Sequence, residues 1–512
     1  MLSYLSLPFI LILGSGFCVW GQGSDPWNQF RGPNGSGIRA DASIGVPSVD
    51  DLLWKTPLPF GLSCPVLSDD KIFLTGMESK SLLTIALERK SGKILWKKKA
   101  PKTEIEKFHP SSSPVTPTPF VEEKRLYIYF GSYGLICYDH QGMEIWKKPL
   151  PTPRSLYGTA SSPLVHENLL IQVIDDDANM PNSQVSRSRI LALDKESGEI
   201  IWERFRPFHR SGWSTPTIWE HGRSRELVVL GNGSLRGYSL PDGEEKWQVD
   251  GFSRETIARP MTGNGKVYAS GSRLGGSADL KTDPLPFWEA VIGFDTNGDN
   301  RLEREEMTGH FTFPFRPQLP PGHPGFGLPM PREPQKKKAR LDGIFLRMDK
   351  NRDGFWDQDE FIDNLTIGRG KPLLVAVKPG GRGNVTHTHV EWEFNKGIPE
   401  VPSPILLENF IYMISNGGVL TCVGTDKGRM IYRKRIGGLG QYVASPVVAG
   451  KNLILISEEG LVSVVRTGKD FELLGQLQLK EKIRVTPALG INNLYLRSES
   501  HLWAFGKMSG RP

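Results

Sequence analysis

Two twelve-residue segments carry the side chains with the most specific chemistry in this sequence: DTNGDNRLEREE at 295–306 and DKNRDGFWDQDE at 349–360. In both, carboxylate or carboxamide groups fall at positions 1, 3, 5, 9 and 12, and position 7 offers its backbone carbonyl. These positions are held by Asp295, Asn297, Asp299, Arg301, Glu303 and Glu306 in the first segment, and by Asp349, Asn351, Asp353, Phe355, Asp357 and Glu360 in the second. Oxygen ligands at this spacing wrap a calcium ion, which the final glutamate chelates with both oxygens.

The remaining positions of both segments fit a pair of EF-hand loops. Position 8 is apolar, Leu302 and Trp356, where paired loops usually meet. Position 6 needs a sharp turn; Gly354 suits it, and Asn300 tolerates positive φ better than most residues. The flanking runs FWEAVIGF and LDGIFLRM have helical apolar spacing. The alternative is a degenerate acidic loop that binds nothing. This alternative is stronger for the first loop, which has Asn300 where the second has glycine.

Between the loops, the Pro-rich stretch 311–340 ends in Lys336-Lys337-Lys338. We expect it to be a mobile linker. The simplest explanation of the three lysines is a run of charges exposed to solvent.

A repeat supplies the framework that carries these loops. A short Ser/Thr-Pro step followed by an alternating apolar run recurs eight times, with its prolines at Pro65, Pro119, Pro163, Pro216, Pro260, Pro404, Pro446 and Pro487. The second half of the unit gives an apolar strand, a turn ending in glycine, and a strand that reaches tryptophan at Trp96, Trp146, Trp202, Trp247 and Trp392. Each unit therefore predicts four short strands. Such units bury both faces only when arranged radially, with the tryptophans between neighbouring sheets.

The last copy predicts how the ring closes. It stops before a fourth strand, and DDLLWKTPL near the N-terminus, with Trp54, supplies the missing one. We therefore predict an all-β fold, an eight-bladed β-propeller with N-/C-terminal strand closure, formed by 22–271 and 372–507. One interval between prolines is about 100 residues too long, because a small α-helical EF-hand insertion at 272–371 replaces the hairpin between GKVYASGS and KPLLVAVK.

The motif A-L-D-x-x-x-G-x-x-x-W, best seen from Ala192 to Trp202, resembles the PQQ-like (quinoprotein) propeller repeat. The opening PWNQFRGPNGSG also resembles the start of secreted bacterial members. That family includes quinone-dependent alcohol dehydrogenases and the cofactor-free, eight-bladed BamB-type assembly lipoprotein. The resemblance implies for the dehydrogenases a vicinal Cys-Cys disulfide and a calcium bound by Glu, Asn and Asp in the propeller. This sequence has no Cys-Cys pair and no evident matching triad, which argues against PQQ as a cofactor.

The hairpin that carries the insertion lies on the same face as the connections between blades, where propellers commonly bind ligands. The connections place near one mouth the residues Arg154, Tyr157, His209, Arg210, Trp213, Arg254, Arg259, Tyr442 and Arg484. Arginines with one Trp and two Tyr suit an anionic, flat or peptide-like ligand. The plainer alternative, that each side chain caps a strand or fills the channel, stays open. His387 and His389 fall on one face of an expected strand. They could bind a metal ion with a third ligand; the simpler alternative is that they are exposed or capped.

Residues 1–21 carry no charge and contain an apolar run, and they predict a secretory signal peptide cleaved near Gly21. We therefore expect a periplasmic or extracellular protein, and no later stretch is long enough to span a bilayer. The net charge of +7 gives no argument for nucleic acid at this size. Cys64, Cys137 and Cys422 are too few for a disulfide framework.

These features predict an exported, calcium-binding β-propeller that acts as a non-catalytic scaffold for an unknown protein or a small anionic ligand, with no catalytic residues. The alternative is a PQQ-dependent alcohol or sugar oxidoreductase.

Overall fold

The computed structural model describes most of the chain between Trp27 and Gly506. The described residues are 27–155, 157–176, 187–206, 209, 212–273, 285–314, 327–349, 351–365, 371–438 and 440–506. The predicted signal peptide and Arg210 lie outside them. None of the described helices is long and apolar enough to cross a membrane.

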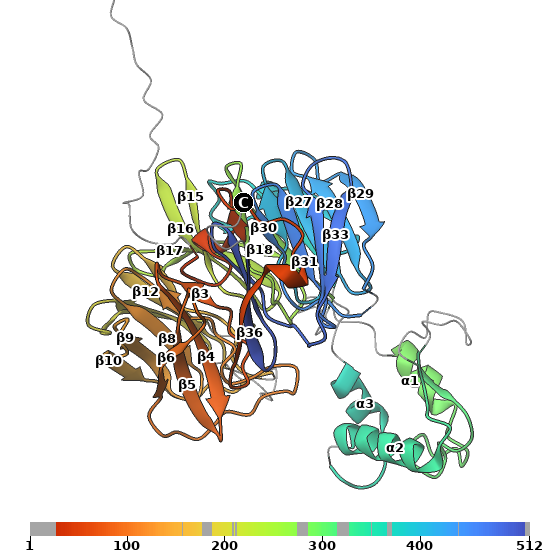
Figure 1. Ribbon diagram of the computed structural model, residues 1–512. Coiled ribbons are helices and arrows are strands. Elements are labelled where there is room, and N and C mark those ends of the chain that lie inside the picture. Colours follow the sequence, from red (N-terminus) through yellow and green to blue (C-terminus); the bar gives the residue numbers. More distant parts are fainter. Residues whose placement is uncertain are drawn as a thin grey trace, which may run out of the picture.

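Eight sheets of four antiparallel strands form the blades of a propeller (Figure 1). Blades 1 and 2 are β3–β6 (Val66–Leu67, Lys71–Glu78, Ser81–Glu88, Ile94–Lys99) and β7–β10 (Phe120–Val121, Leu126–Phe130, Gly134–Tyr138, Glu144–Pro149). Blades 3 and 4 are β11–β14 (Leu164–His166, Leu169–Ile174, Arg189–Asp194, Ile200–Phe205) and β15–β18 (Thr217–His221, Ser224–Gly231, Ser234–Ser239, Glu245–Asp250). Each of these sheets matches one predicted repeat.

The second half of the ring contains the interruption and the closure. Blade 5 is β19, β20, β23 and β25 (Met261–Gly263, Lys266–Gly271, Leu373–Val377, Val390–Phe394). Blades 6 and 7 are β26–β29 (Ile405–Leu407, Phe410–Ser415, Val419–Gly424, Met430–Arg435) and β30–β33 (Val447–Ala449, Asn452–Ile456, Leu461–Arg466, Glu472–Gln478). Blade 8 is β34–β36 (Ala488–Leu489, Asn493–Arg497, His501–Gly506) with β2 (Leu52–Pro57) as its fourth strand.

The pairing of β2 with β36 confirms the predicted closure. Thr56 lies opposite Leu502 and Lys55 opposite Trp503, in antiparallel register. The insertion also lies where the sequence predicted it, because β20 pairs directly with β23 across the inserted segment. Two short strands are added outside the repeats: β1 (Ile38–Arg39) runs parallel to β30, and β24 (Gly383–Asn384) runs parallel to β18.

Tryptophan side chains join neighbouring blades, as the repeat predicted. The indole N–H groups of five of them donate to a backbone carbonyl of the next blade at 2.9–3.2 Å: Trp54, Trp96, Trp146, Trp202 and Trp392. The turn glycine of the next blade packs against the ring. At Gly198, with φ of 74°, an added Cβ would lie 2.7 Å from the indole of Trp146. The glycine is therefore required twice, for its backbone angle and for the close approach.

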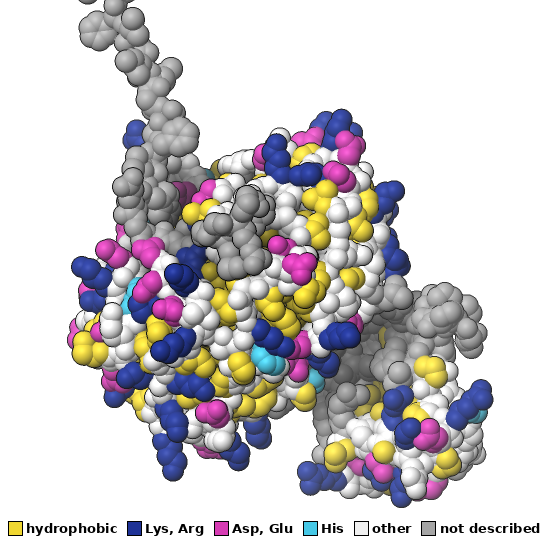
Figure 2. Space-filling model, in the orientation of Figure 1, with side chains coloured by type: hydrophobic (Ala, Val, Ile, Leu, Met, Phe, Trp, Pro, Cys, Tyr) yellow, Lys and Arg dark blue, Asp and Glu magenta, His cyan; other side chains and the backbone are white. Residues whose placement is uncertain are grey.

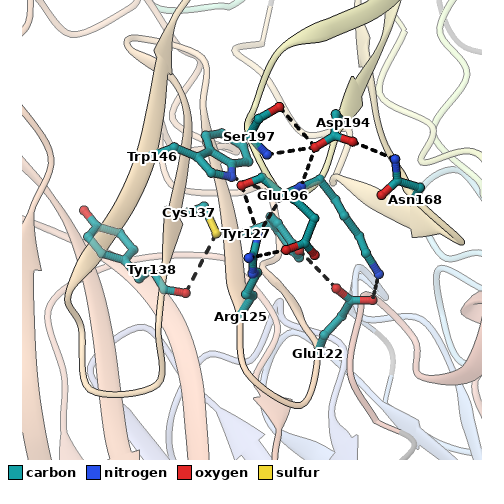
Figure 3. A network of polar contacts seen from close by, with 11 residues as sticks. Glu122, Arg125, Tyr127, Cys137, Tyr138, Trp146, Asn168, Asp194, Glu196 and Ser197 are labelled. Atoms are coloured by element: carbon teal, nitrogen blue, oxygen red, sulfur yellow. Dashed lines mark hydrogen bonds and ion pairs between the residues drawn. The ribbon is translucent and has the colours of Figure 1, made fainter.

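Figure 3 shows how the turn that receives Trp146 is held. Asp194 accepts hydrogen bonds from the backbone N–H groups of Glu196 and Ser197, at 2.9 and 2.8 Å. These bonds, that of Ser197 first, lower the pKa of Asp194. From blade 2, Arg125 donates to the Lys195 carbonyl, and Glu122 pairs with the Lys195 ammonium group at 2.8 Å. The aspartate of the repeat motif thus fixes the turn, and side chains of the preceding blade then hold it by a hydrogen bond and an ion pair.

The inserted module contains α1 (Leu285–Ile292), α2 (Pro334–Met348) and α3 (Gln358–Leu365), with the hairpin β21–β22 (Thr312–Pro314, Gly327–Pro329). Its buried side chains, among them Phe345, Trp356 and Phe361, form a core of their own. The expectation of a linker over 311–340 is wrong for the strands and for α2, which begins at Pro334 and includes the three lysines. Pro334 suits the first turn of a helix, and the following residues pack an apolar face onto the module core.

The remaining short helices lie outside the blades. They are the 3₁₀ turns η1 (Pro33–Gly35) and η2 (Val49–Asp51) and the one-turn helix α4 (Thr386–His389). His387 and His389 therefore lie in α4 and not on a strand, which corrects the expectation for this pair.

The surface mixes charges of both signs. Figure 2 shows basic and acidic side chains interspersed over the face in view. Several form ion pairs between segments that are distant in sequence. One example is Lys55 with Glu481 at 2.6 Å, which closure of the ring brings together.

The packing of Gly198 against Trp146 can be separated from its backbone strain. Gly198→Ala is expected to destabilise the protein by about 1–3 kcal/mol more than Gly265→Ala, because only the first adds overpacking to strain. Gly265 has a similar φ of 71° but no atom within 4 Å of an added Cβ. Denaturant unfolding of both variants measures the difference, and equal losses would contradict the role assigned to Gly198.

Candidate functional site

The residue before each repeated proline lies at the central axis, and most of these residues are joined in a girdle. The eight positions are Cys64, Thr118, Ser162, Thr215, Arg259, Ser403, Ser445 and Thr486. At six steps the backbone N–H of one donates to the side-chain hydroxyl of its counterpart in the next blade, at 2.9–3.1 Å. Because the following proline has no N–H, this amide and its hydroxyl acceptor are the groups by which adjacent blades can bond here.

The N-terminal segment 27–43 occupies the channel inside the blades (Figure 1, red). Its backbone carbonyls at Trp27 and Asn28 accept from the innermost strands of blades 1 and 2. The Asn34 side chain donates to blade 4 at Ile218, and Arg31 donates to blade 6 at Pro404. The segment then pairs with blade 7 through β1. It therefore covers inner strand edges that would otherwise be unpaired. We call residues 27–43 the plug.

A cavity of about 310 Å³ lies at the girdle. Its walls come from the connections between blades, and Phe30 of the plug also lines it. Six girdle hydroxyl residues line it as well: Thr118, Ser162, Thr215, Ser403, Ser445 and Thr486. The sequence contained this signal in the Ser/Thr-Pro step, but the step alone did not show that the hydroxyls face one cavity.

Tyr157 and Trp213 form an aromatic wall of the cavity. Their rings are 5.1 Å apart and nearly perpendicular. The Trp213 indole N–H donates to the Gly158 carbonyl at 2.8 Å, which fixes the ring. On its other side Tyr157 packs edge-on against His109. The structure thus brings together these two predicted residues and Arg484, which also lines the cavity.

The other predicted residues have different positions. The guanidinium of Arg259 is buried and donates to the Phe30 carbonyl of the plug at 2.9 Å. Arg154 pairs with Asp176, and the Tyr442 hydroxyl donates to the Gly437 carbonyl. His209 is buried and Arg254 is half-buried, and neither lines the cavity. Of the described arginines expected at the mouth, Arg484 therefore lines the cavity. Arg259 and Arg154 do not, because a carbonyl of the plug and a carboxylate take up their guanidinium groups.

The charged residues that line the cavity were mostly missed by sequence reasoning. Arg484 pairs with Glu499 at 2.8 Å and lies 3.9 Å from Glu458. Glu255 is half-buried, and burial raises the pKa of its carboxyl, an effect that Arg254 opposes. Glu255 and Glu458, the two acids of the lining, lie in irregular connections, where no sequence pattern indicated a functional role.

The thiol of Cys64 also lines the cavity. Burial raises the pKa of Cys64 to about 11, in spite of hydrogen bonds with Thr118 and Thr486. Cys64, Cys137 and Cys422 are all buried and free. A thiol with this pKa is protonated at neutral pH and is a poor nucleophile.

The two acidic loops of the insertion fold alike. In each, the position-1 aspartate accepts the N–H of position 6, at 2.9 Å for Asp295 and 3.0 Å for Asp349. Position 6 is left-handed in both, with φ of 61° at Asn300 and 93° at Gly354, as the sequence predicted.

The loops are also paired. The backbones of Leu302 and Trp356 exchange two hydrogen bonds of 3.0 Å, which confirms that they meet at position 8. The glutamates at position 12 reach back to the amide of position 3, Glu306 to Asn297 and Glu360 to Asn351. Among the described residues, no three His, Cys, Asp or Glu side chains are grouped closely enough to hold a metal ion by themselves. An EF-hand loop adds asparagine, carbonyl and water oxygens to its carboxylates.

Comparisons with known proteins agree with this architecture. Residues 46–203 and 79–297 match a family model described as outer membrane protein assembly factor BamB. The chain is a PQQ-like β-propeller. A computationally designed protein, Ika8, has the same fold at 9% identity and a TM-score of 0.50, covering 89% of this chain and 99% of its own.

Two natural structures are similar at lower scores. BamB from Moraxella catarrhalis is 11% identical with a TM-score of 0.48, covering 89% of this chain and 99% of that one. A europium-containing methanol dehydrogenase is 10% identical with a TM-score of 0.49, covering 95% and 98%. Comparison with curated proteins finds no matching sequence.

Glu106 joins two connections that form the cavity wall. Its Oε1 accepts from the backbone N–H and the hydroxyl of Thr159, at 3.1 and 2.9 Å. Burial nevertheless raises the pKa of Glu106 to about 7. The native state therefore keeps a proton on this carboxyl between its ordinary pKa and about pH 7, where the unfolded chain has lost it, and stability falls as the pH rises through this window.

Glu106→Gln should remove this dependence. Between about pH 5 and about pH 8 the wild type is expected to lose on the order of 3 kcal/mol of stability, as an upper bound, relative to the variant. Denaturant unfolding at both pH values measures it, with Glu104→Gln as a control because Glu104 is exposed on the same connection. Parallel pH profiles for the wild type and Glu106→Gln would refute the assignment.

Proposed function

We propose that this protein is an exported, non-catalytic β-propeller that binds a ligand or a protein partner at the face carrying the cavity and holds calcium in its inserted module. The observation that carries the proposal is the cavity itself, to whose lining six blades each contribute a girdle serine or threonine and two connections an aromatic wall. A concave, mostly apolar site with a few convergent polar groups is the usual form of a binding pocket.

The side chains around the cavity favour binding over catalysis. The described lining includes serines and threonines but no histidine. Ser111 of the lining has its hydroxyl 2.8 Å from Nδ1 of His109, but the same nitrogen accepts the backbone N–H of Ser111, as in a local turn two residues long. The Cys64 thiol is held protonated, and the guanidinium of Arg484 is committed to Glu499. We retain the expectation that PQQ is not a cofactor; a stoichiometric quinone spectrum with dye reduction on an alcohol, after addition of PQQ, would contradict the proposal.

The family description and the predicted signal peptide support export and a place in the cell envelope. The matching family model is named for an outer membrane assembly factor. If this chain works in a comparable way, its partner is a protein that contacts the ring, and the partner's identity has to come from capture experiments in the native envelope fraction.

The residues of the inserted loops fit calcium. Each loop offers carboxylates at positions 1, 5, 9 and 12 and a carboxamide at position 3, a hard oxygen set of the kind calcium prefers. The left-handed residue at position 6 and the Leu302–Trp356 pairing give the loops their required path. Glu306 is well placed to stay ionised: burial opposes this, but amide hydrogen bonds from Glu303, Thr296 and Asn297 together lower its pKa. When bound, the ion would neutralise these carboxylates and stiffen the module.

Titration calorimetry tests the calcium proposal. The protein is expected to bind calcium at roughly 10⁻⁴–10⁻³ M, the range of extracellular modules. Asp349→Ala combined with Glu360→Ala should abolish binding at the second loop. Asp359→Asn is the matched control, since Asp359 is exposed at a position that supplies no ligand. Absence of calcium-dependent heat from the wild type at millimolar calcium would defeat the proposal.

A further inference from the structure

Four girdle hydroxyls carry a hydrogen that no described group accepts. Each oxygen accepts a backbone N–H from the preceding blade; the residues are Ser162, Thr215, Ser403 and Ser445. Thr118 is not among them, because its hydroxyl bonds to the sulfur of Cys64. All four are at least 96% buried and all line the cavity. A buried donor without an acceptor costs free energy unless something else supplies the acceptor. These girdle hydroxyls can therefore donate hydrogen bonds to a ligand in the cavity.

Three buried arginines lie close to the axis, and none of the described carboxylates is paired with them. Arg31, Arg259 and Arg497 are at most 1% exposed, and their guanidinium groups donate to backbone carbonyls of Pro404, Phe30 and Thr75. Burial lowers the pKa of each to about 9, which still leaves it charged at neutral pH. Charges in an interior of low dielectric constant act over longer distances than exposed ones. Two of these charges lie beside the lining: Arg497 donates to the carbonyl of Ser63, the neighbour of Cys64, at 2.8 Å, and Arg259 is itself a girdle residue. The buried end of the cavity thus favours negative charge.

The more exposed part of the lining has the opposite preference. Glu255 and Glu458 are partly exposed, and the cation beside them, Arg484, already pairs with Glu499. Tyr157 also lines the cavity; burial raises the pKa of its hydroxyl, and the nearby Glu255 carboxylate adds to this effect. A second anionic group on the ligand would therefore meet carboxylates, whereas a flat apolar body would meet the aromatic wall.

We propose that the cavity binds the carboxylate of a ligand whose remaining body is flat and uncharged, with the carboxylate on the girdle hydroxyls and the body against Tyr157 and Trp213. The proposal rests on the proposed function, in that this face is the binding face. Such a group is available on a free aryl carboxylate and on the C-terminus of a chain ending in an aromatic residue. It is not available on a ligand that carries several acidic groups around its ring.

Calorimetric titration with defined probes tests this site. 3-Phenylpropionate is expected to bind to the calcium-loaded full-length protein, and the neutral 3-phenylpropionamide to bind at least about tenfold more weakly, the order expected for a hydrogen bond to a charged group. Phthalate, with two carboxylates, should also bind more weakly than 3-phenylpropionate. A blocked peptide with a free C-terminal phenylalanine, compared with 3-phenylpropionate, distinguishes the two sources of the carboxylate.

Neighbouring serines give a matched pair of variants. Ser162→Ala removes a girdle donor and should weaken 3-phenylpropionate binding by about tenfold. Ser161→Ala, one residue away, buried but outside the lining, should leave binding within about twofold. Ser162→Thr keeps the hydroxyl and should retain affinity even where Ser162→Ala loses stability.

Equal affinity for the carboxylate and the amide, equal effects of the two alanine variants, or no binding of any probe at millimolar concentration would overturn the inference. The proposed function would then still stand or fall separately, on calcium binding and on the capture of a partner.

Discussion

The structure depends on one requirement at its centre: eight chain segments must reach the axis and still satisfy their buried backbone amides. In each segment a proline follows the residue at the axis, and proline has no N–H. The axial residue must therefore supply the hydrogen-bond donor, and its counterpart in the next blade must supply the acceptor. Serine and threonine meet both demands within a single residue, as at Thr118 and Ser162. The arrangement of the blades around the channel and the cavity follows from this girdle.

The plug completes what the girdle begins. An eight-bladed ring leaves a channel lined by innermost strand edges, and residues 27–43 pair with several of them. Gly35 shows how tightly the two parts fit, because an added Cβ would lie 2.0 Å from the Arg259 guanidinium. Arg259 occupies a girdle position at which six of the other blades have serine or threonine, and its guanidinium donates to the plug. With the channel occupied by the plug, the cavity of about 310 Å³ remains at the girdle, and this is where we propose that binding occurs.

Sequence alone predicted the features that repeat and missed those that occur once. The eight blades, the closure through Trp54 and the position of the insertion were all predicted, because strand period, turn glycines and prolines recur at a fixed spacing. The pairing of Leu302 with Trp356 was predictable because the two twelve-residue acidic segments share one pattern, with an apolar residue at position 8 of each. Sequence places a residue on a connection but does not give the direction of its side chain: Arg259, expected at the mouth, donates to the plug instead. Glu106 and Glu255 gave no signal, since their environments come from segments distant in sequence.

Amide hydrogen exchange tests the girdle most directly. The backbone amides of Cys64, Thr118, Ser162, Ser403 and Ser445 are each bonded to a hydroxyl of the next blade. They should therefore exchange only when the ring opens, as slowly as the amides of the central strands. If these amides exchange as fast as those of the exposed hairpin turns while the strands remain protected, the girdle does not hold the blades together, and the account of the cavity built on it is wrong.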